Sequence, residues 1–301
     1  MSADKRARVD AAISELRFRP NAAARALVSG RAKIIAVVAG NTSQYGYAET
    51  IRGIEEGARA AGYLVTITVV ESAAEEVVDR AASLVLAQAV AGVIVLKFDP
   101  PGVAALQRFP ADLPRVAIAG VRQTGVAQVV LAEAEAAEKL TDYLLGLGHR
   151  TVHHVRVPPS RREDGRTTGW RRALRKAGIA APPIIEASWD PASGRAAGRE
   201  LALRDDVTAI FCGNDEVAIG VIKGLADRGR RVPEDFSVVG FDDHPLAALW
   251  SPALTTVRQD FAALGNRACE MLLGLMQETL VHHFSTEPAA VIIRDSAGPP
   301  R

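Results

Sequence analysis

Two adjacent carboxylates, Asp242 and Asp243, directly follow the apolar run FSVVGF at residues 236–241. A short apolar run is typical of a buried parallel strand, and ligands of parallel sheets bind beyond the carboxyl ends of the strands. The pair Glu55 and Glu56 differs, because neighbouring side chains on a helix point apart and are usually solvated. Candidate ligand-binding carboxylates therefore lie at 242 and 243.

The sequence lacks the common catalytic and cofactor-binding motifs. It contains no GxxxxGK[ST] phosphate loop, no GxGxxG after the first predicted strand, no HExxH and no GxSxG. The 6 histidines have no recognisable spacing to a nucleophile or a metal ligand. We therefore predict a protein that is not an enzyme and that has no metal or cofactor. Of the adjacent His153 and His154, we expect one to face the core and the other to face solvent.

Short β-branched runs alternate with longer helical patterns after residue 33. Residues 46–61 show the helical pattern, with Ile51, Ile54 and Ala58 on one face. Apolar strands joined by helical crossovers indicate parallel sheets that are covered on both faces. So many strands would overfill one twisted sheet, so the predicted fold class is α/β, with two doubly wound parallel-sheet lobes after a short helical leader. The predicted strands are 34–39, 63–70, 92–96, 115–119, 151–157, 183–187, 208–212, 236–241 and 289–294.

The composition is that of a folded protein. Of 301 residues, 48% are hydrophobic and 24% are charged, which excludes a disordered chain. Cys212 and Cys269 lie in apolar surroundings without metal-ligand spacing, so we expect two small core residues in a reducing compartment. The charged N-terminus has no apolar signal-peptide region, and no apolar run has the length of a membrane span. These features predict a cytoplasmic protein.

The N-terminal leader carries most of the charge asymmetry. Residues 1–33 hold an excess of basic side chains, although the net charge of the chain is only +1. Such a segment is either a solvated face or a site for a polyanion. Residues 2–17 predict a helix that Pro20 ends. Residues 21–28 predict a second helix, which needs a partner because isolated helices shorter than about 12–15 residues are marginal in water.

A series of motifs along the chain resembles the lactose/galactose-repressor (LacI/GalR) family of bacterial transcription regulators. The motifs are NDEVAIG at 214–220, VPEDFSVVGFDD at 232–243, LGHRTV at 147–152, RTTGW at 166–170 and RPNAAARALVSGRAKIIAVV at 19–38. The resemblance implies an effector-sensing repressor that binds operator DNA as a homodimer, with a tetramer left open. It also implies a core like a periplasmic sugar-binding protein, with two lobes joined by crossing strands.

The resemblance further implies a set of effector-binding residues. Arg166 stands where the family's arginine grips the effector, Asp242 where an aspartate contacts it, and Trp189 where an aromatic ring stacks on it. Asn214 is also a good helix N-cap, and Gln259 matches a polar residue near the lobe junction. If these residues do not bind an effector, Arg166 would be a solvated arginine at a helix start, Asp242 a turn residue and Trp189 an ordinary core tryptophan. The implied effector is a small polar metabolite, a sugar or related polyol, with a purine as the alternative.

Two segments of the first lobe depart from the family pattern. The usual Asp-x-Ser-Asn-Pro-Phe-Phe is replaced by NTSQYGY at 41–47, so Tyr47 takes the second aromatic position and adds a hydroxyl suited to a polar ligand. The usual Val-Asp-Asn reads Leu131-Ala132-Glu133, so a common carboxylate is missing at 132. The identity of the effector therefore cannot be inferred from that of a relative.

The N-terminus resembles only part of the family's DNA-binding region. Residues 1–19 match a remnant of the DNA-binding domain, so we expect the reading helices to be missing, through an internal start or trimming. Residues 20–33 match the hinge helix and linker, in which Asn21, Arg25 and Leu27 would bind DNA. Leu27 matches a wedge pushed into the minor groove, and its alternative is packing on its own lobe.

The resemblance divides the core into two discontinuous lobes. The first would hold residues 34–147 and 260–283, and the second residues 148–259 and 284–301. Rival functions are a sugar-binding module without DNA-binding activity of its own, an enzyme on the same fold, and a regulator that pairs with full-length partners.

Overall fold

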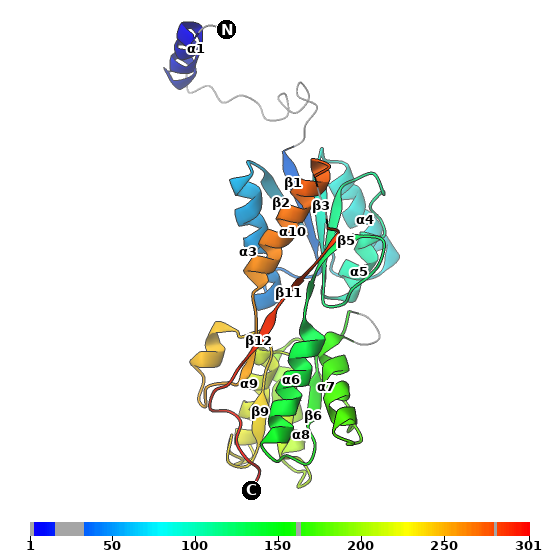
Figure 1. The fold of residues 1–301 in the computed structure, drawn as a ribbon, viewed down its shortest axis with the longest axis vertical. Helices are drawn as coiled ribbons and strands as arrows, with labels where there is room; N and C mark the ends of the chain where they lie inside the picture. The colour runs from blue at the N-terminus through cyan, green and yellow to red at the C-terminus, as the bar shows by residue number, and fades with distance from the viewer. Residues whose placement is uncertain (1–2, 16–32, 161–163, 280–281) are drawn as a thin grey trace.

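The protein has a two-lobed α/β architecture (Figure 1), and the computed structural model describes residues 3–15, 33–160, 164–279 and 282–301. The first lobe contains a six-stranded parallel sheet in the order β11-β5-β4-β3-β1-β2. Its strands are β1 (Ile34–Ala39), β2 (Leu64–Val69), β3 (Gly92–Lys97), β4 (Arg115–Ala119), β5 (Ala127–Leu131) and β11 (Phe284–Glu287).

Helices cover both faces of the first sheet. Successive side chains of a strand point to opposite faces, and β1 shows the consequence. Ile35 and Val37 pack with α3 (Tyr45–Ala60) and α10 (Phe261–Met276), whereas Ala36 and Val38 pack with α4 (Glu75–Leu86) and α5 (Pro100–Leu106). Every residue of β1 after the first is buried, which explains its continuous apolar sequence.

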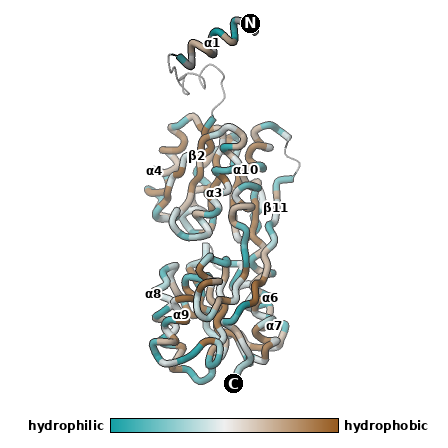
Figure 2. The backbone as a smooth tube through the Cα atoms, turned by 90° about the vertical axis from the view of Figure 1, so that its left-hand side faces the viewer, coloured by the Kyte–Doolittle hydropathy of each residue, from teal (hydrophilic) through white to brown (hydrophobic). Residues whose placement is uncertain are grey.

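The second lobe repeats this arrangement with a four-stranded parallel sheet in the order β7-β6-β8-β9. Helices α8 and α9 lie on one side of the lobe, and α6 and α7 lie on the other (Figure 2). The strands are β6 (His153–Arg156), β7 (Ile185–Glu186), β8 (Ala209–Cys212) and β9 (Ser237–Val239), and the helices are α6 (Glu133–Gly146), α7 (Gly165–Lys176), α8 (Pro191–Leu201), α9 (Asp215–Ala226) and the 3₁₀ helix η1 (Pro245–Ala248).

Three segments connect the lobes within the described residues. The chain passes from β5 into α6, from β10 (Thr256–Gln259) into α10, and from β11 into β12 (Ala289–Ile292). Strands β10 and β12 pair antiparallel. Two isolated parallel bridges, Val239 with Thr255 and Asp242 with Arg258, connect the β10 segment to the end of β9 and the loop after it. The leader contains α1 (Ala3–Glu15), where a helix was expected.

The structure corrects the expected lobe boundaries at two places. Helix α6 was assigned to the first lobe, but Ala136, Leu140 and Leu144 pack in the second lobe with Trp170. Residues 284–287 were assigned to the second lobe, but they form β11 beside β5 of the first sheet. Both errors arose because β5 and β11 were not recognised as strands, so the crossing points next to them were misplaced.

The structure also tests smaller expectations. Cys212 and Cys269 are free and buried, as predicted. The prediction that one of His153 and His154 faces solvent is wrong, because both are buried in a sheet that is covered on both faces. In the described part of the chain, no helix has the length and apolar character needed to cross a membrane.

Close packing of α8 on α9 generates a stability prediction. A methyl group added at Gly220 would lie 2.1 Å from the carbonyl oxygen of Pro191, whereas Gly146 in α6 has no such neighbour within 4 Å. We expect Gly220→Ala to lower the free energy of unfolding by about 1–3 kcal/mol through overpacking. Gly146→Ala should raise it by about 0.5–1 kcal/mol, because glycine costs more backbone entropy in a helix. Urea denaturation checks both, and equal effects would contradict this account.

Candidate functional site

A cleft with an empty volume of about 680 Å³ lies between the lobes. This volume is within the range of small-molecule sites, which are about 300–1,000 Å³. The cleft contains five of the residues that the sequence singled out, and they come from both lobes: Tyr47, Arg166, Trp189, Asn214 and Asp242.

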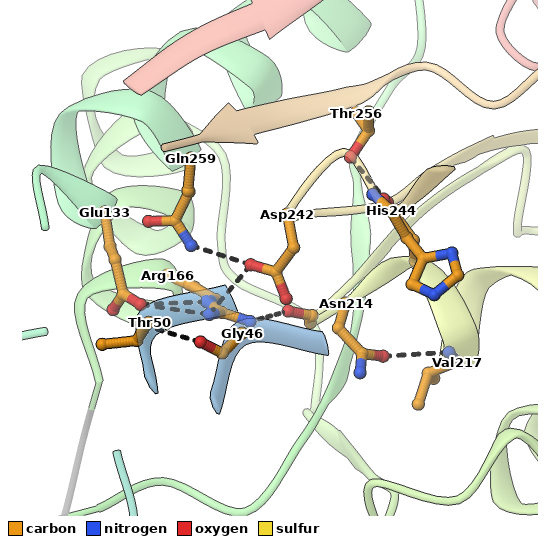
Figure 3. Close-up of polar contacts among 12 residues, drawn as sticks. Gly46, Thr50, Glu133, Arg166, Asn214, Val217, Asp242, His244, Thr256 and Gln259 are labelled. Carbon is orange, nitrogen blue, oxygen red and sulfur yellow. Dashed lines mark hydrogen bonds and ion pairs between the residues drawn. The ribbon is translucent and has the colours of Figure 1, made fainter. Parts of the chain in front are cut away.

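Arg166, in the first turn of α7, is the central charge of the cleft (Figure 3). Its Nη2 lies 3.1 Å from Glu133 Oε1 and 3.2 Å from Asp242 Oδ1, and Nη1 donates to the Gly213 carbonyl oxygen. The guanidinium also lies 4.6 Å from the centroid of the Phe241 ring. The solvated-arginine alternative is therefore wrong, because Arg166 is only 8% exposed and paired with two carboxylates.

The buried charges of this cluster shift one another's pKa values. Burial raises the pKa of Glu133 and of Asp242, and the Arg166 guanidinium opposes the rise in both. Burial alone would lower the pKa of Arg166, but Asp242 and Glu133 raise it above its ordinary value. One guanidinium thus faces two buried carboxylates, and the pKa of each stays raised despite it.

The loop after β9 holds Asp242 in an unusual backbone conformation. Asp242 and Asp243 have φ values of 106° and 54°, which side-chain-bearing residues seldom adopt. Such strain costs of order 1–3 kcal/mol and persists where the surroundings enforce it. Buried Asp215 is one such constraint, because it accepts hydrogen bonds from the His244 amide at 2.6 Å and from Thr256 Oγ1 at 2.6 Å.

Gly240 allows Asp215 to reach this loop. A methyl group at Gly240 would lie 2.1 Å from Asp215 Oδ1, so the close approach requires glycine. Burial raises the pKa of Asp215 well above its ordinary value. Asp215 therefore acts on the cleft through the backbone of the loop.

The first lobe supplies aromatic residues to the cleft. The Tyr47 hydroxyl donates to Asp99 Oδ2 at 2.5 Å, and burial followed by Asp99 raises the Tyr47 pKa. The hydroxyl that the sequence suggested for a ligand is therefore already bonded within the lobe. Tyr45 contacts His244 of the second lobe, with ring centroids 4.8 Å apart. The loop that carries Asp242 thus touches the other lobe.

Three remaining candidates differ in how they meet the cleft. Asn214 lines the cleft and also caps α9, its Oδ1 accepting from the Val217 amide at 2.9 Å, so its Nδ2 takes no part in the cap. Trp189 lines the cleft, as an aromatic ring that stacks on a ligand would, and it also packs on the core of the second lobe, as a core tryptophan would. Gln259 donates to Asp242 Oδ1 at 2.7 Å and does not line the cleft itself.

Sequence reasoning missed four charged residues of this site. Glu133 supplies a carboxylate one residue after the position where the family's aspartate is missing. Glu216 follows the Asn214-Asp215 pair at the start of α9 and lines the cleft. Lys97 is the last residue of β3 and Asp99 lies two residues beyond it, at a strand end where the rule that identified Asp242 also applies.

Asn21, Arg25 and Leu27, the candidate DNA-binding residues, lie outside the described residues. Within the described ranges, no group of three or more His, Cys, Asp or Glu side chains is arranged to hold a metal ion.

Two covered parallel sheets, three crossing segments and a cleft between them that holds buried charged groups define a two-lobed ligand-binding core. A family model for a periplasmic binding protein-like domain matches residues 141–297, more than half of the chain. The HTH-type transcriptional repressor PurR of Pectobacterium carotovorum subsp. carotovorum (strain PC1) is 32% identical over 278 residues, covering 90% of this chain and 81% of the relative.

The lactose operon repressor of Escherichia coli (strain K12) is 27% identical over 297 residues, covering 98% of this chain and 82% of the relative. The crystal structure of the lac repressor dimer bound to operator and the anti-inducer ONPF superimposes with a TM-score of 0.90 at 27% identity, covering 99% of this chain and 91% of that one. The chain belongs to the lactose/galactose-repressor family.

The charge cluster generates a prediction for stability against pH. Arg166→Met leaves Glu133 and Asp242 buried without a countercharge, so the free energy of unfolding at pH 7 should fall by about 3–5 kcal/mol. Carboxyls whose pKa is raised in the folded state bind protons more tightly there, so acidification to about pH 5 should recover part of the loss. Denaturant titrations at the two pH values measure this. Arg195→Met, which removes an exposed partner of Asp227, should change little. A loss independent of pH would contradict the charge explanation.

Proposed function

We propose that this chain is an effector-responsive transcription repressor that binds a small polar metabolite, most simply a sugar or polyol, between its lobes. The cleft carries the proposal, because it combines residues of both lobes with a buried arginine and carboxylates. Carboxylate and amide groups suit the paired hydroxyls of a sugar, and the Trp189 ring suits its apolar face. Membership of the repressor family supports the regulatory role.

Effector binding would act on the angle between the lobes. A ligand held by Asp242 touches a loop that carries His244, and His244 contacts Tyr45 of the first lobe. A ligand that bridges both walls binds one lobe arrangement better than another, and this difference in affinity shifts the population. The site is thereby coupled to the first lobe, from which the N-terminal leader extends.

We propose that operator DNA is bound through the N-terminal region of a homodimer, with Asn21, Arg25 and Leu27 as contact residues. The related lac repressor has been crystallised as a dimer on its operator, which supports this arrangement. A short helix that needs a dimer and DNA for stability gives the effector an equilibrium to bias.

Ligand binding tests the effector role. At about 100 times its dissociation constant, a sugar or polyol effector should stabilise the folded chain by roughly 2.7 kcal/mol, visible as a thermal shift. Trp189→Ala and Asp242→Ala should each abolish the shift, because one removes the stacking ring and the other the central carboxylate. Trp250→Ala is the matched control, since this partly buried ring packs on the second lobe but does not line the cleft. Ligand binding that survives both cleft substitutions would overturn the proposed site.

The operator contact has its own test. In a dimer that carries a helix-turn-helix, Leu27→Ala should weaken operator binding by at least about tenfold, or about 1.4 kcal/mol, through loss of the apolar wedge. Fluorescence anisotropy with labelled operator measures this affinity. Unchanged affinity would refute the wedge and favour packing of Leu27 on its own lobe.

A further inference from the structure

The hydrogen-bonding capacity of the cleft is unevenly distributed between donors and acceptors. Arg166 uses Nε and Nη2 on Glu133, Nη2 also on Asp242, and Nη1 on the Gly213 carbonyl. A guanidinium has five N–H donors, so most of this fork is already engaged. An incoming carboxylate or phosphate would have to displace protein acceptors from Arg166.

The second cation of the cleft is engaged as well. Lys97 is 2% exposed, and its Nζ lies 2.5 Å from Gln123 Oε1. Burial with a fixed partner limits how far this ammonium can turn toward a ligand. Neither Arg166 nor Lys97 is therefore placed as an open anion receptor.

Several acceptor oxygens in and next to the cleft, in contrast, have no hydrogen-bond donor among the described residues. Glu216 lines the cleft half-buried and receives no hydrogen bond or ion pair from another described residue. Gln259 donates through Nε2 to Asp242, while its Oε1 is buried without a hydrogen-bond partner beside the cleft. Asp242 takes both of its contacts on Oδ1. These oxygens need donors that the described protein does not supply.

Among the charged groups of the described lining, carboxylates outnumber cations. The described lining contains the carboxylates of Glu133, Asp164, Glu216 and Asp242 against the cations Lys97 and Arg166. Burial raises the pKa of Glu216 because it disfavours the charged form, the negative charge of Asp242 raises it further, and the Arg166 guanidinium only partly opposes the rise. An unpaired, partly buried carboxylate is costly to keep, and such features are typical of ligand-binding sites.

We propose that Glu216 binds the effector directly and that the effector is a donor-rich molecule without negative charge, either a neutral polyol or one that carries an amine. The inference rests on the proposed function, since it specifies the ligand of the same cleft. Hydroxyl or ammonium donors satisfy the free oxygens of Glu216 and Asp242, both of which line the cleft. We expect phosphorylated and carboxylated sugars to bind more weakly, because they bring like charge to a wall whose described cations, Lys97 and Arg166, are already paired.

A structural alternative for Glu216 is that it only stabilises the N-terminus of α9 through the helix dipole. Glu76 offers a matched comparison, because it stands in the first turn of α4 but is exposed. If Glu216 binds the effector, Glu216→Gln should raise the melting temperature of the free protein at pH 7 by about 1–3 °C, since it removes an uncompensated charge. Glu76→Gln should leave it equal or lower. The helix-dipole account predicts that both substitutions lower it.

The gain from Glu216→Gln should disappear on acidification. The pKa of Glu216 is raised in the folded state, so the cost of its charge is present at neutral pH and vanishes once the carboxyl is protonated in both states. Melting curves at pH 7 and at about pH 4 measure this. A variant that is no more stable than wild type at pH 7 would overturn the unpaired-carboxylate premise and the proposal with it.

Ligand charge is tested with matched compounds. The probes are glucose, galactose and ribose, the amines glucosamine and galactosamine, and the anions glucose 6-phosphate and glucuronate. Neutral or amine members should shift the melting temperature of the wild type, and Glu216→Gln should weaken that binding by about 10- to 100-fold. Glu76→Gln should bind like the wild type.

The outcomes separate this inference from the proposed function. Stabilisation by an anion in preference to its neutral counterpart would overturn the inference, yet loss of that binding in Trp189→Ala would preserve the effector site. Neutral-ligand binding that Glu216→Gln leaves unchanged would also overturn it. If no probe binds, a higher melting temperature of Glu216→Gln at pH 7 supports the inference, and an unchanged or lower one overturns it.

Discussion

A buried guanidinium joins separate parts of the second lobe at the wall of the cleft. Arg166 ties the first residue of α6 to the loop after β9 and to the carbonyl oxygen of Gly213, which directly follows β8. Buried ion pairs contribute little net stability, because desolvation offsets their attraction. Their geometric requirement is strict, however, and here it fixes the orientation of the groups that face a ligand. The arrangement of the cleft depends on this constraint.

The same cluster connects chemistry in the cleft to the joint between the lobes. Glu133 stands at the start of α6, directly after the chain has crossed from β5. Gln259 stands at the end of β10, directly before the chain crosses back, and it contacts Asp242. A ligand that competes for Asp242 therefore acts next to two of the crossing segments. Packed interfaces of this kind switch between discrete arrangements, so a small displacement can be amplified.

Much of the fold and part of the site followed from the sequence. Strands such as β1 and β3 were predicted because both faces are buried, which produces continuous apolar runs. Strands β10 and β11 were not, because TVRQ and FSTE are polar and their pairing comes from residues distant in sequence. Arg166 and Asp242 were predicted from motifs at strand ends and helix starts. Glu133 was missed because its role depends on a tertiary contact 33 residues away along the chain, and Glu216 because unpaired acceptors become visible only when every neighbour is placed.

The position of β11 has a consequence for biosynthesis. Strand β11 completes one edge of the first sheet beside β5, although 152 residues separate Leu131 from Phe284 and the entire second sheet is made in between. A ribosome releases residues in order, so the lobe whose synthesis begins first cannot be finished until Phe284–Glu287 have emerged. Contacts of such long range close slowly and leave apolar edges exposed meanwhile. The nascent chain should therefore complete its second sheet first, and the open edge at β5 needs protection until β11 has been made.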